Sequence, residues 1–111
     1  MRDDLDRPVP SDITELFGSD AIAEMLRRLG SPYVALNPGS SFRGLHDSLV
    51  NYLGNRDPQL LLCRHEEHAV APAHGWAKVT GTPLAVTLPQ YGGFLPAAPA
   101  PFDACVARAR R

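Results

Sequence analysis

The chain has few features that mark specialised proteins. Its 111 residues include only two cysteines, Cys63 and Cys105, which are too few for a disulfide framework and favour a reduced intracellular chain. The formal net charge is -1 at pH 7, so no excess of one sign points to nucleic acid or to an anionic membrane. With 44% hydrophobic and 21% charged residues, the composition is that of one small globular domain.

Long apolar runs are also missing. The first residues, MRDDLDRPVPSD, are charged and contain no apolar core, which excludes a secretory signal. The one long uncharged stretch, residues 79–102, contains five prolines and three glycines and therefore does not predict a membrane-spanning helix. We expect a cytoplasmic chain with neither a membrane nor a nucleic acid as its partner.

Three segments have the apolar periodicity of helices. The first covers about residues 20–29, with Ser19 as its expected N-cap and Gly30 as its stop. The second covers about residues 42–53. The third runs from Glu66 or Glu67 to Thr80, where alanines recur at every fourth residue. For the first helix we expect one buried apolar stripe made of Ile22, Met25, Leu26 and Leu29.

Short apolar runs between these helices read as buried strands, at residues 33–36, 59–63 and 84–88. Helices and strands that alternate in this way predict an α/β fold with three layers, α/β/α, around a parallel sheet. We expect a polar lead over residues 1–18, the folded domain over residues 19–88, and a divergent tail rich in proline and alanine over residues 89–111, where residues 104–111 could form a short helix. Three strands make a small core, and open sheet edges favour association.

Two segments carry the candidate chemistry. Ligands of open parallel sheets bind at the carboxyl ends of the strands. The loop at residues 37–41 and the segment Arg64-His65-Glu66-Glu67-His68 both follow predicted strands. A dense group of titratable side chains at this edge favours a functional site.

The order of short motifs resembles a known family. The first motif is Gly18-Ser19-Asp20-Ala21-Ile22-Ala23, and the next two are Tyr33-Val34 and Pro38-Gly39. They are followed by Arg64-His65-Glu66, Ala73-His74-Gly75-Trp76-Ala77 and Thr80-Gly81. This series is similar to the N-terminal pyrimidine-binding domain of thiamine-diphosphate-dependent enzymes of the acetolactate-synthase type. The resemblance covers roughly residues 16–86, and beyond it the chain reads as truncated relative to the family.

The resemblance implies a partial thiamine-diphosphate-binding fold with Glu66 as its catalytic and cofactor-binding residue. In this family the matching glutamate bonds the aminopyrimidine ring and favours the tautomer that deprotonates the thiazolium carbon, and the cofactor is the electron sink. Pro38 and Gly39 match the turn near the cofactor, although a plain connecting loop is an equal reading. The family holds magnesium and the diphosphate on a separate domain with a Gly-Asp-Gly motif. This motif does not occur in the chain.

Several features leave other readings open. A glutamate in the first turn of a helix often serves only to stabilise the helix, because its negative charge lies at the positive end of the helix dipole. To hold a proton, Glu66 must be shielded from water, so we expect the chain to bend after Arg64 and the arginine to point away. Pro72 should kink the third helix or delay its start, at a cost of ~3 kcal/mol.

We expect the histidines, Cys63 and Trp76 to have structural roles rather than to bind a metal or the cofactor. His65 and His68 are spaced i, i+3, which does not fit the zinc-protease pattern, so we expect no metal site. His46 and His74 are expected to be partly exposed or hydrogen-bonded. Cys63 is expected to be a small buried residue and Trp76, on the third helix, a core residue.

These observations predict a thiamine diphosphate-binding part of an acetolactate-synthase-like or 2-keto-acid decarboxylase-type enzyme, inactive alone. Its expected partner is a diphosphate-binding domain or subunit, in a homo- or hetero-oligomer. One alternative is the small subunit of a split decarboxylase, which a partner carrying Gly-Asp-Gly would complete. Another is a noncatalytic α/β fragment.

Overall fold

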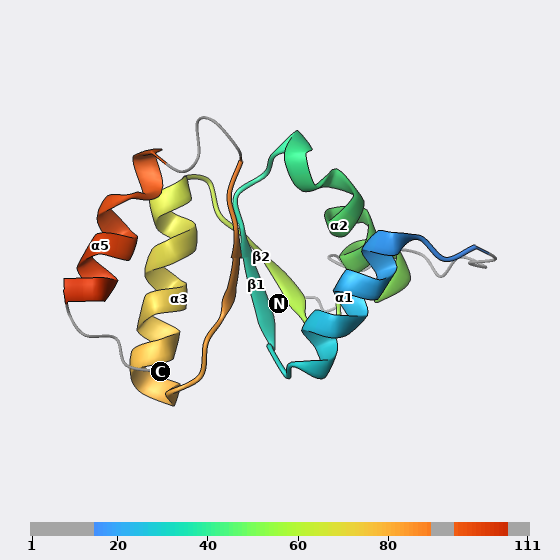
Figure 1. Ribbon diagram of the computed structural model, residues 1–111, viewed down its shortest axis with the longest axis horizontal. Helices are drawn as coiled ribbons and strands as arrows, with labels where there is room; N and C mark the ends of the chain where they lie inside the picture. The colour runs from blue at the N-terminus through green and yellow to red at the C-terminus, as the bar shows by residue number, and fades with distance from the viewer. Residues whose placement is uncertain (1–14, 90–94, 107–111) are drawn as a thin grey trace, which may run out of the picture.

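The computed structural model describes residues 15–89 and 95–106, and Figure 1 shows the arrangement of their helices and strands. All strands are short, and helical segments connect them. In chain order the elements are α1 (Gly18–Arg28), β1 (Tyr33–Leu36), the 3-10 turn η1 (Ser40–Phe42), α2 (Arg43–Asp47), the π-helical turn η2 (Ser48–Tyr52), β2 (Gln59–Leu62), α3 (Glu66–Thr80), β3 (Ala85–Thr87) and α5 (Pro99–Val106).

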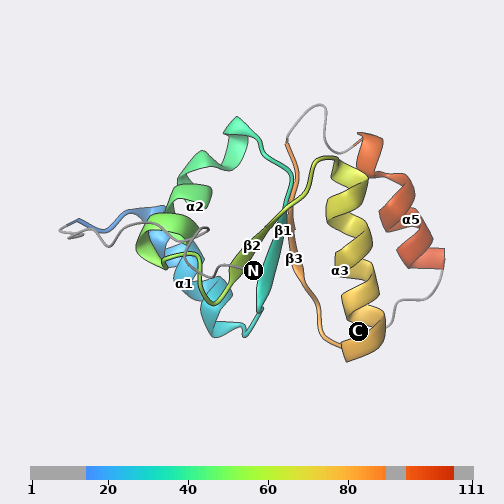
Figure 2. The ribbon, with the colours of Figure 1, turned by 180° about the vertical axis from the view of Figure 1, so that it is seen from behind.

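The three strands form one parallel sheet in the order β2-β1-β3. In the register, Val34 of the central strand lies between Leu60 and Ala85, and Leu36 lies between Leu62 and Thr87. Figures 1 and 2 show α1 and α2 on one side of the sheet and α3 and α5 on the other. The predicted three-layer α/β/α fold is confirmed.

The core on the α1 side is built around Ala23, Val34 and Leu49, all of which are fully buried. Leu26 packs against this cluster, as predicted, but the rest of the predicted stripe of α1 does not. Ile22, Met25 and Leu29 are 47%, 56% and 74% exposed. The stripe that contains Ala23 and the stripe that contains Ile22 are only one residue apart on the helix. Because alanine is small, α1 lies closer to the sheet when Ala23 faces it than it would with Ile22 in that place.

The start of α1 also differs from the prediction. The N-cap is Phe17 rather than Ser19. The carboxylate of Asp20 accepts a hydrogen bond from the Phe17 backbone N–H at 2.7 Å, so an acidic side chain in the first turn performs the capping. The Ser19 hydroxyl instead accepts a hydrogen bond from Ser48 on η2 at 2.8 Å and ties the two helical segments together.

The helix α3 starts at Glu66 and runs without interruption through Pro72 to Thr80. The predicted delayed start is therefore wrong. Proline removes one donor, the N–H that would bond the carbonyl of His68. Both residues are exposed, so water can solvate this turn. The helix ends as predicted at Gly81, which has φ +73° and donates its N–H to the Ala77 carbonyl at 2.9 Å.

The single tryptophan links α3 to the sheet. The ring of Trp76 meets the ring of Tyr33 edge to face, with 5.8 Å between centroids. Its Nε1 donates to the hydroxyl of Thr82 at 3.1 Å. Trp76 is half-buried and also lines an apolar cavity, so the prediction of a core residue holds only in part.

Within the described part of the tail, Pro99–Val106 form α5, which packs against α3. The helix therefore begins earlier than the predicted 104–111, and residues 107–111 of that range lie outside the described residues, as does most of the predicted polar lead. Among the described residues, no helix has the length and apolar character needed to cross a membrane.

Candidate functional site

The carboxyl ends of all three strands meet at Asn37, which follows β1 and is only 7% exposed. Its backbone N–H donates to the carbonyl of Thr87 on β3 at 3.1 Å. Its side-chain Nδ2 donates to the carbonyl of Cys63, just after β2, also at 3.1 Å. One buried amide therefore holds both neighbouring loops at the edge where parallel sheets bind ligands.

The loop after β1 lies tightly against the loop after β3. A Cβ placed on Gly39 would lie 2.9 Å from Cγ of Pro89 and 3.3 Å from its Cα. The φ of Gly39 is -164°, an ordinary extended value, so close approach rather than backbone angle is what calls for glycine here. The two loops together form one wall of the edge.

A pocket of about 200 Å³ opens beside this wall, on the α2 side of the sheet. Pro38 and Gly39 are among its lining residues, together with the side chains Leu36, Phe42 and Leu62. Leu62 is 72% exposed, which leaves an apolar surface open at the strand ends. The chemistry of these walls suits an uncharged ring or an alkyl group.

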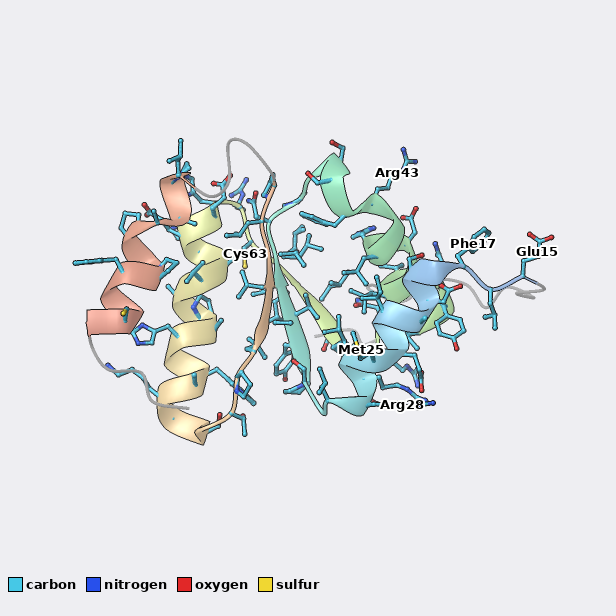
Figure 3. All side chains as sticks on the ribbon, in the orientation of Figure 1. Glu15, Phe17, Met25, Arg28, Arg43 and Cys63 are labelled. Atoms are coloured by element: carbon cyan, nitrogen blue, oxygen red, sulfur yellow. The ribbon has the colours of Figure 1, made fainter. Side chains whose placement is uncertain are left out.

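The pocket is also lined by two residues of α2 that can carry a charge, Arg43 and His46. Arg43 is 84% exposed and points outward from α2 (Figure 3). Asp47 accepts a contact from Arg43 at 3.9 Å and lies 3.3 Å from Nδ1 of His46. His46 is thus partly exposed and hydrogen-bonded, as predicted, and the carboxylate of Asp47 partly neutralises the charge of Arg43.

Glu66 occupies the first turn of α3, directly after β2. Its side chain is 16% exposed, and Oε2 lies 3.7 Å from Nδ1 of His65, the N-cap residue. The chain bends at Arg64 and His65, and Arg64 is exposed. The carboxylate is therefore largely sheltered from water at the positive end of the helix, while the arginine beside it in sequence is turned to solvent.

The remaining titratable groups near this edge are structural. His65 and His68 are exposed, with ring centroids 5.8 Å apart. Among the described residues, no group of three or more potential ligands could hold a metal ion. Cys63, half-buried on the α3 side (Figure 3), has its pKa raised because burial penalises the thiolate.

Among the described residues, two buried side-chain polar atoms have no hydrogen-bond partner: Oγ1 of Thr87 and Nε2 of His74. Thr87 ends β3 and forms part of the carboxyl edge that Asn37 organises. A buried hydroxyl without a partner costs about 1–3 kcal/mol and is a natural contact for a polar ligand atom or a water. His74 is half-buried and therefore partly exposed, as predicted, while its Nε2 has no hydrogen-bond partner among the described residues.

The structure brings the predicted site residues to one edge of the sheet but to different sides of it. Pro38 and Gly39 line the pocket on the α2 side, whereas Glu66 begins α3 on the other face. Sequence reasoning missed the linking role of Asn37 and the contact of Pro89 with Gly39. An asparagine directly after a buried strand was the available signal for the first.

Comparison with known families agrees with this geometry. The family described as "Thiamine pyrophosphate enzyme, N-terminal TPP binding domain" matches residues 17–110. The chain belongs to this family. The match extends past residue 86, where the motifs of the resemblance end, and includes the segment that forms α5 in this TPP-binding domain. No curated protein and no solved structure gave a match.

Proposed function

We propose that this TPP-binding domain holds the aminopyrimidine end of thiamine diphosphate, with Glu66 as the group that keeps or shares a proton with the ring. The observation that carries the proposal is the sheltered carboxylate at the carboxyl edge of the sheet, with 16% of its side chain exposed. A carboxyl group that is largely sheltered from water at this edge has little competition from solvent for a hydrogen bond with a ring nitrogen.

The neighbouring groups support this role. Asn37 fixes the loops after β2 and β3, so the edge is organised before a ligand arrives. The hydroxyl of Thr87 is a buried polar atom in need of a partner. Pro38 and Gly39 offer a flat apolar wall against which a ring can lie. These residues share the carboxyl edge of the sheet, with the Pro38–Gly39 loop on one face and Glu66 on the other.

The chemistry we assign to the whole enzyme is bond making or breaking next to a carbonyl, of the acetolactate-synthase or 2-keto-acid decarboxylase type. Thiamine diphosphate, when bound, supplies the electron sink. We propose that the diphosphate and its magnesium are held by a second domain or subunit carrying Gly-Asp-Gly, because this chain has no such motif. On this proposal the chain alone is inactive.

The test is a calorimetric titration of thiamine diphosphate with magnesium into the chain, with and without a candidate partner that carries Gly-Asp-Gly. Glu66→Gln is compared with Glu67→Gln, which removes the same charge from the exposed next residue. We expect Glu66→Gln alone to weaken binding about 10-fold, since leaving a buried polar group without its hydrogen-bond partner costs about 1–3 kcal/mol. Equal binding by both variants would remove Glu66 from the proposal. Absence of binding by the wild type with every partner would favour the noncatalytic fragment.

A further inference from the structure

A second cavity, of about 340 Å³, lies where the start of α1 packs against α2 and the π-helical turn η2. It shares no lining residue with the pocket at the carboxyl edge of the sheet. The turn η2 contributes Ser48, Asn51 and Tyr52 to its wall, and single π-helical turns are rare and frequent at functional sites. The Ser48 hydroxyl donates to that of Ser19 at 2.8 Å and holds η2 to α1, so the cavity is formed before a ligand arrives.

The walls of this cavity are acidic and aromatic. Glu15, Asp20 and Asp47 contribute carboxylates, and Phe17 and Tyr52 contribute rings. Figure 3 shows Glu15 and Phe17 beside the start of α1. Among the described residues that line the cavity, none carries a positive charge. Carboxylates and aromatic rings both attract cations, so the walls favour a positively charged ligand and disfavour an anion.

Asp20 is the most deeply buried of the three carboxylates, with only 6% of the residue exposed. Its Oδ2 accepts the hydrogen bond from the Phe17 backbone N–H at 2.7 Å. Its Oδ1 has no hydrogen bond within the described part of the chain. This oxygen is not among the fully enclosed atoms that lack a partner, so it opens to the cavity that Asp20 lines. A buried carboxylate oxygen without a donor is a contact for a ligand that can donate a hydrogen bond.

The other two carboxylates lie at the outer end of the cavity. The side chain of Asp47 is 53% exposed, and Glu15 is exposed as well. The contact of Asp47 with Arg43 is long, at 3.9 Å, and leaves the carboxylate able to accept from a second donor. The cavity therefore has a sheltered negative charge at one end and solvent-facing negative charges at the other.

We propose that this cavity, called here the amine site, binds a small aliphatic diamine. One ammonium group donates to Oδ1 of Asp20 at the sheltered end. The alkyl chain lies along the rings of Phe17 and Tyr52, and the second ammonium group lies at the outer end beside Asp47. Binding at the amine site is a further function of the domain and does not depend on thiamine diphosphate.

The test is a calorimetric titration of 1,4-diaminobutane into the full chain at neutral pH, with n-butylamine and butanoate as comparison compounds. We expect the diamine to bind more tightly than the monoamine and butanoate not to bind. Asp20→Asn keeps an acceptor for the Phe17 N–H but removes the charge, so it should weaken the binding of both amines about 10-fold. Asp57→Asn removes one charge from an exposed residue outside the cavity and is the matched control, which should bind like the wild type.

A second variant tests the outer end of the amine site at a position where folding is not at stake. Asp47→Asn should weaken diamine binding about 2- to 5-fold, as expected for an exposed ion pair, and leave n-butylamine binding unchanged. In two-dimensional NMR, the diamine should shift the amide signals of Phe17, Ser48 and Tyr52.

Three results would overturn the proposal: a wild type that binds neither amine, butanoate binding as tight as that of the diamine, or amide shifts confined to residues outside the cavity. Equal binding by wild type and by an Asp20→Asn variant that circular dichroism shows to be folded would do the same. If Asp20→Asn does not fold, the Asp47→Asn titration and the amide shifts decide.

Discussion

The Nδ2 atom of Asn37 donates to the backbone carbonyl of Cys63 across 3.1 Å, joining two residues that are 26 positions apart in the sequence. The backbone N–H of the same asparagine donates a hydrogen bond to the carbonyl of Thr87. Because each loop at the carboxyl edge is held by this residue, the arrangement of the edge depends on a single buried amide. The bond thereby connects the folding of the sheet to the shape of the candidate site.

Replacing Asn37 with aspartate tests this dependence. The substitution keeps the shape but puts an acceptor against the Cys63 carbonyl, so a buried acceptor loses its donor. We expect the free energy of unfolding to fall by about 1–3 kcal/mol, the cost of an unsatisfied buried polar group. Urea unfolding measures the change. Asn51→Asp, the same substitution at an exposed residue, should stay within about 0.5 kcal/mol of the wild type, and an equal loss in both variants would contradict the assigned role.

Replacing Gly39 and Gly44 with alanine should change the free energy of unfolding in opposite directions. At Gly39 the new Cβ meets the Pro89 ring at 2.9 Å, and we expect a destabilisation of about 1–3 kcal/mol. At Gly44 in α2 the new Cβ lies 3.6 Å from Ser19, an ordinary contact, so the helix should gain about 0.5–1 kcal/mol. Thermal unfolding of both variants checks the prediction. A neutral Gly39→Ala would show that the two loops can separate freely.

Pro72 lies inside α3, and its replacement should stabilise the protein. Pro72→Ala restores a donor for the His68 carbonyl and removes the ring from the helix, so we expect the free energy of unfolding to rise by up to about 3 kcal/mol. Pro101→Ala is the control, since Pro101 occupies the first turn of α5, where the missing N–H has no helical partner. A larger gain from the control would contradict this account.

The two cysteines should react with a chromogenic disulfide reagent in two phases. Cys105 is exposed and should react first, whereas burial raises the pKa of Cys63 and lowers its thiolate fraction. Cys105→Ser should remove the fast phase and Cys63→Ser the slow one. A thiol with a folded pKa above its unfolded value loses stability as the pH rises past the unfolded value. Raising the pH through that range should therefore destabilise the wild type more than Cys63→Ser.

The sequence predicts the fold well because its signals are local and repeated. Apolar runs of four or five residues between helical periods indicate the strands of a parallel sheet, and all three strands form where expected, but only β1 is buried as predicted. Gly81 at the end of α3 is a similarly local signal. The orientation of α1 is different, because Ala23 and Ile22 both lie on apolar stripes, and only the contact with Val34 and Leu49 decides between them.

The candidate site was predictable only in its location. Motif order placed Glu66, Pro38 and Gly39 at the carboxyl edge of the sheet, and the structure has all three there. The placement of Glu66 and the loop on opposite faces arises from the crossover connections, which no single motif encodes. The bond from Asn37 to Cys63 likewise joins distant residues, so it appears only once the strands are paired.

The edge-to-face contact of Tyr33 with Trp76 turns the only indole of the chain into an optical probe. Its emission reports whether the central strand and α3 are joined, and energy transfer from the phenol ring adds a second, distance-sensitive signal. Refolding can thus be followed at a single point of the molecule without attaching a dye.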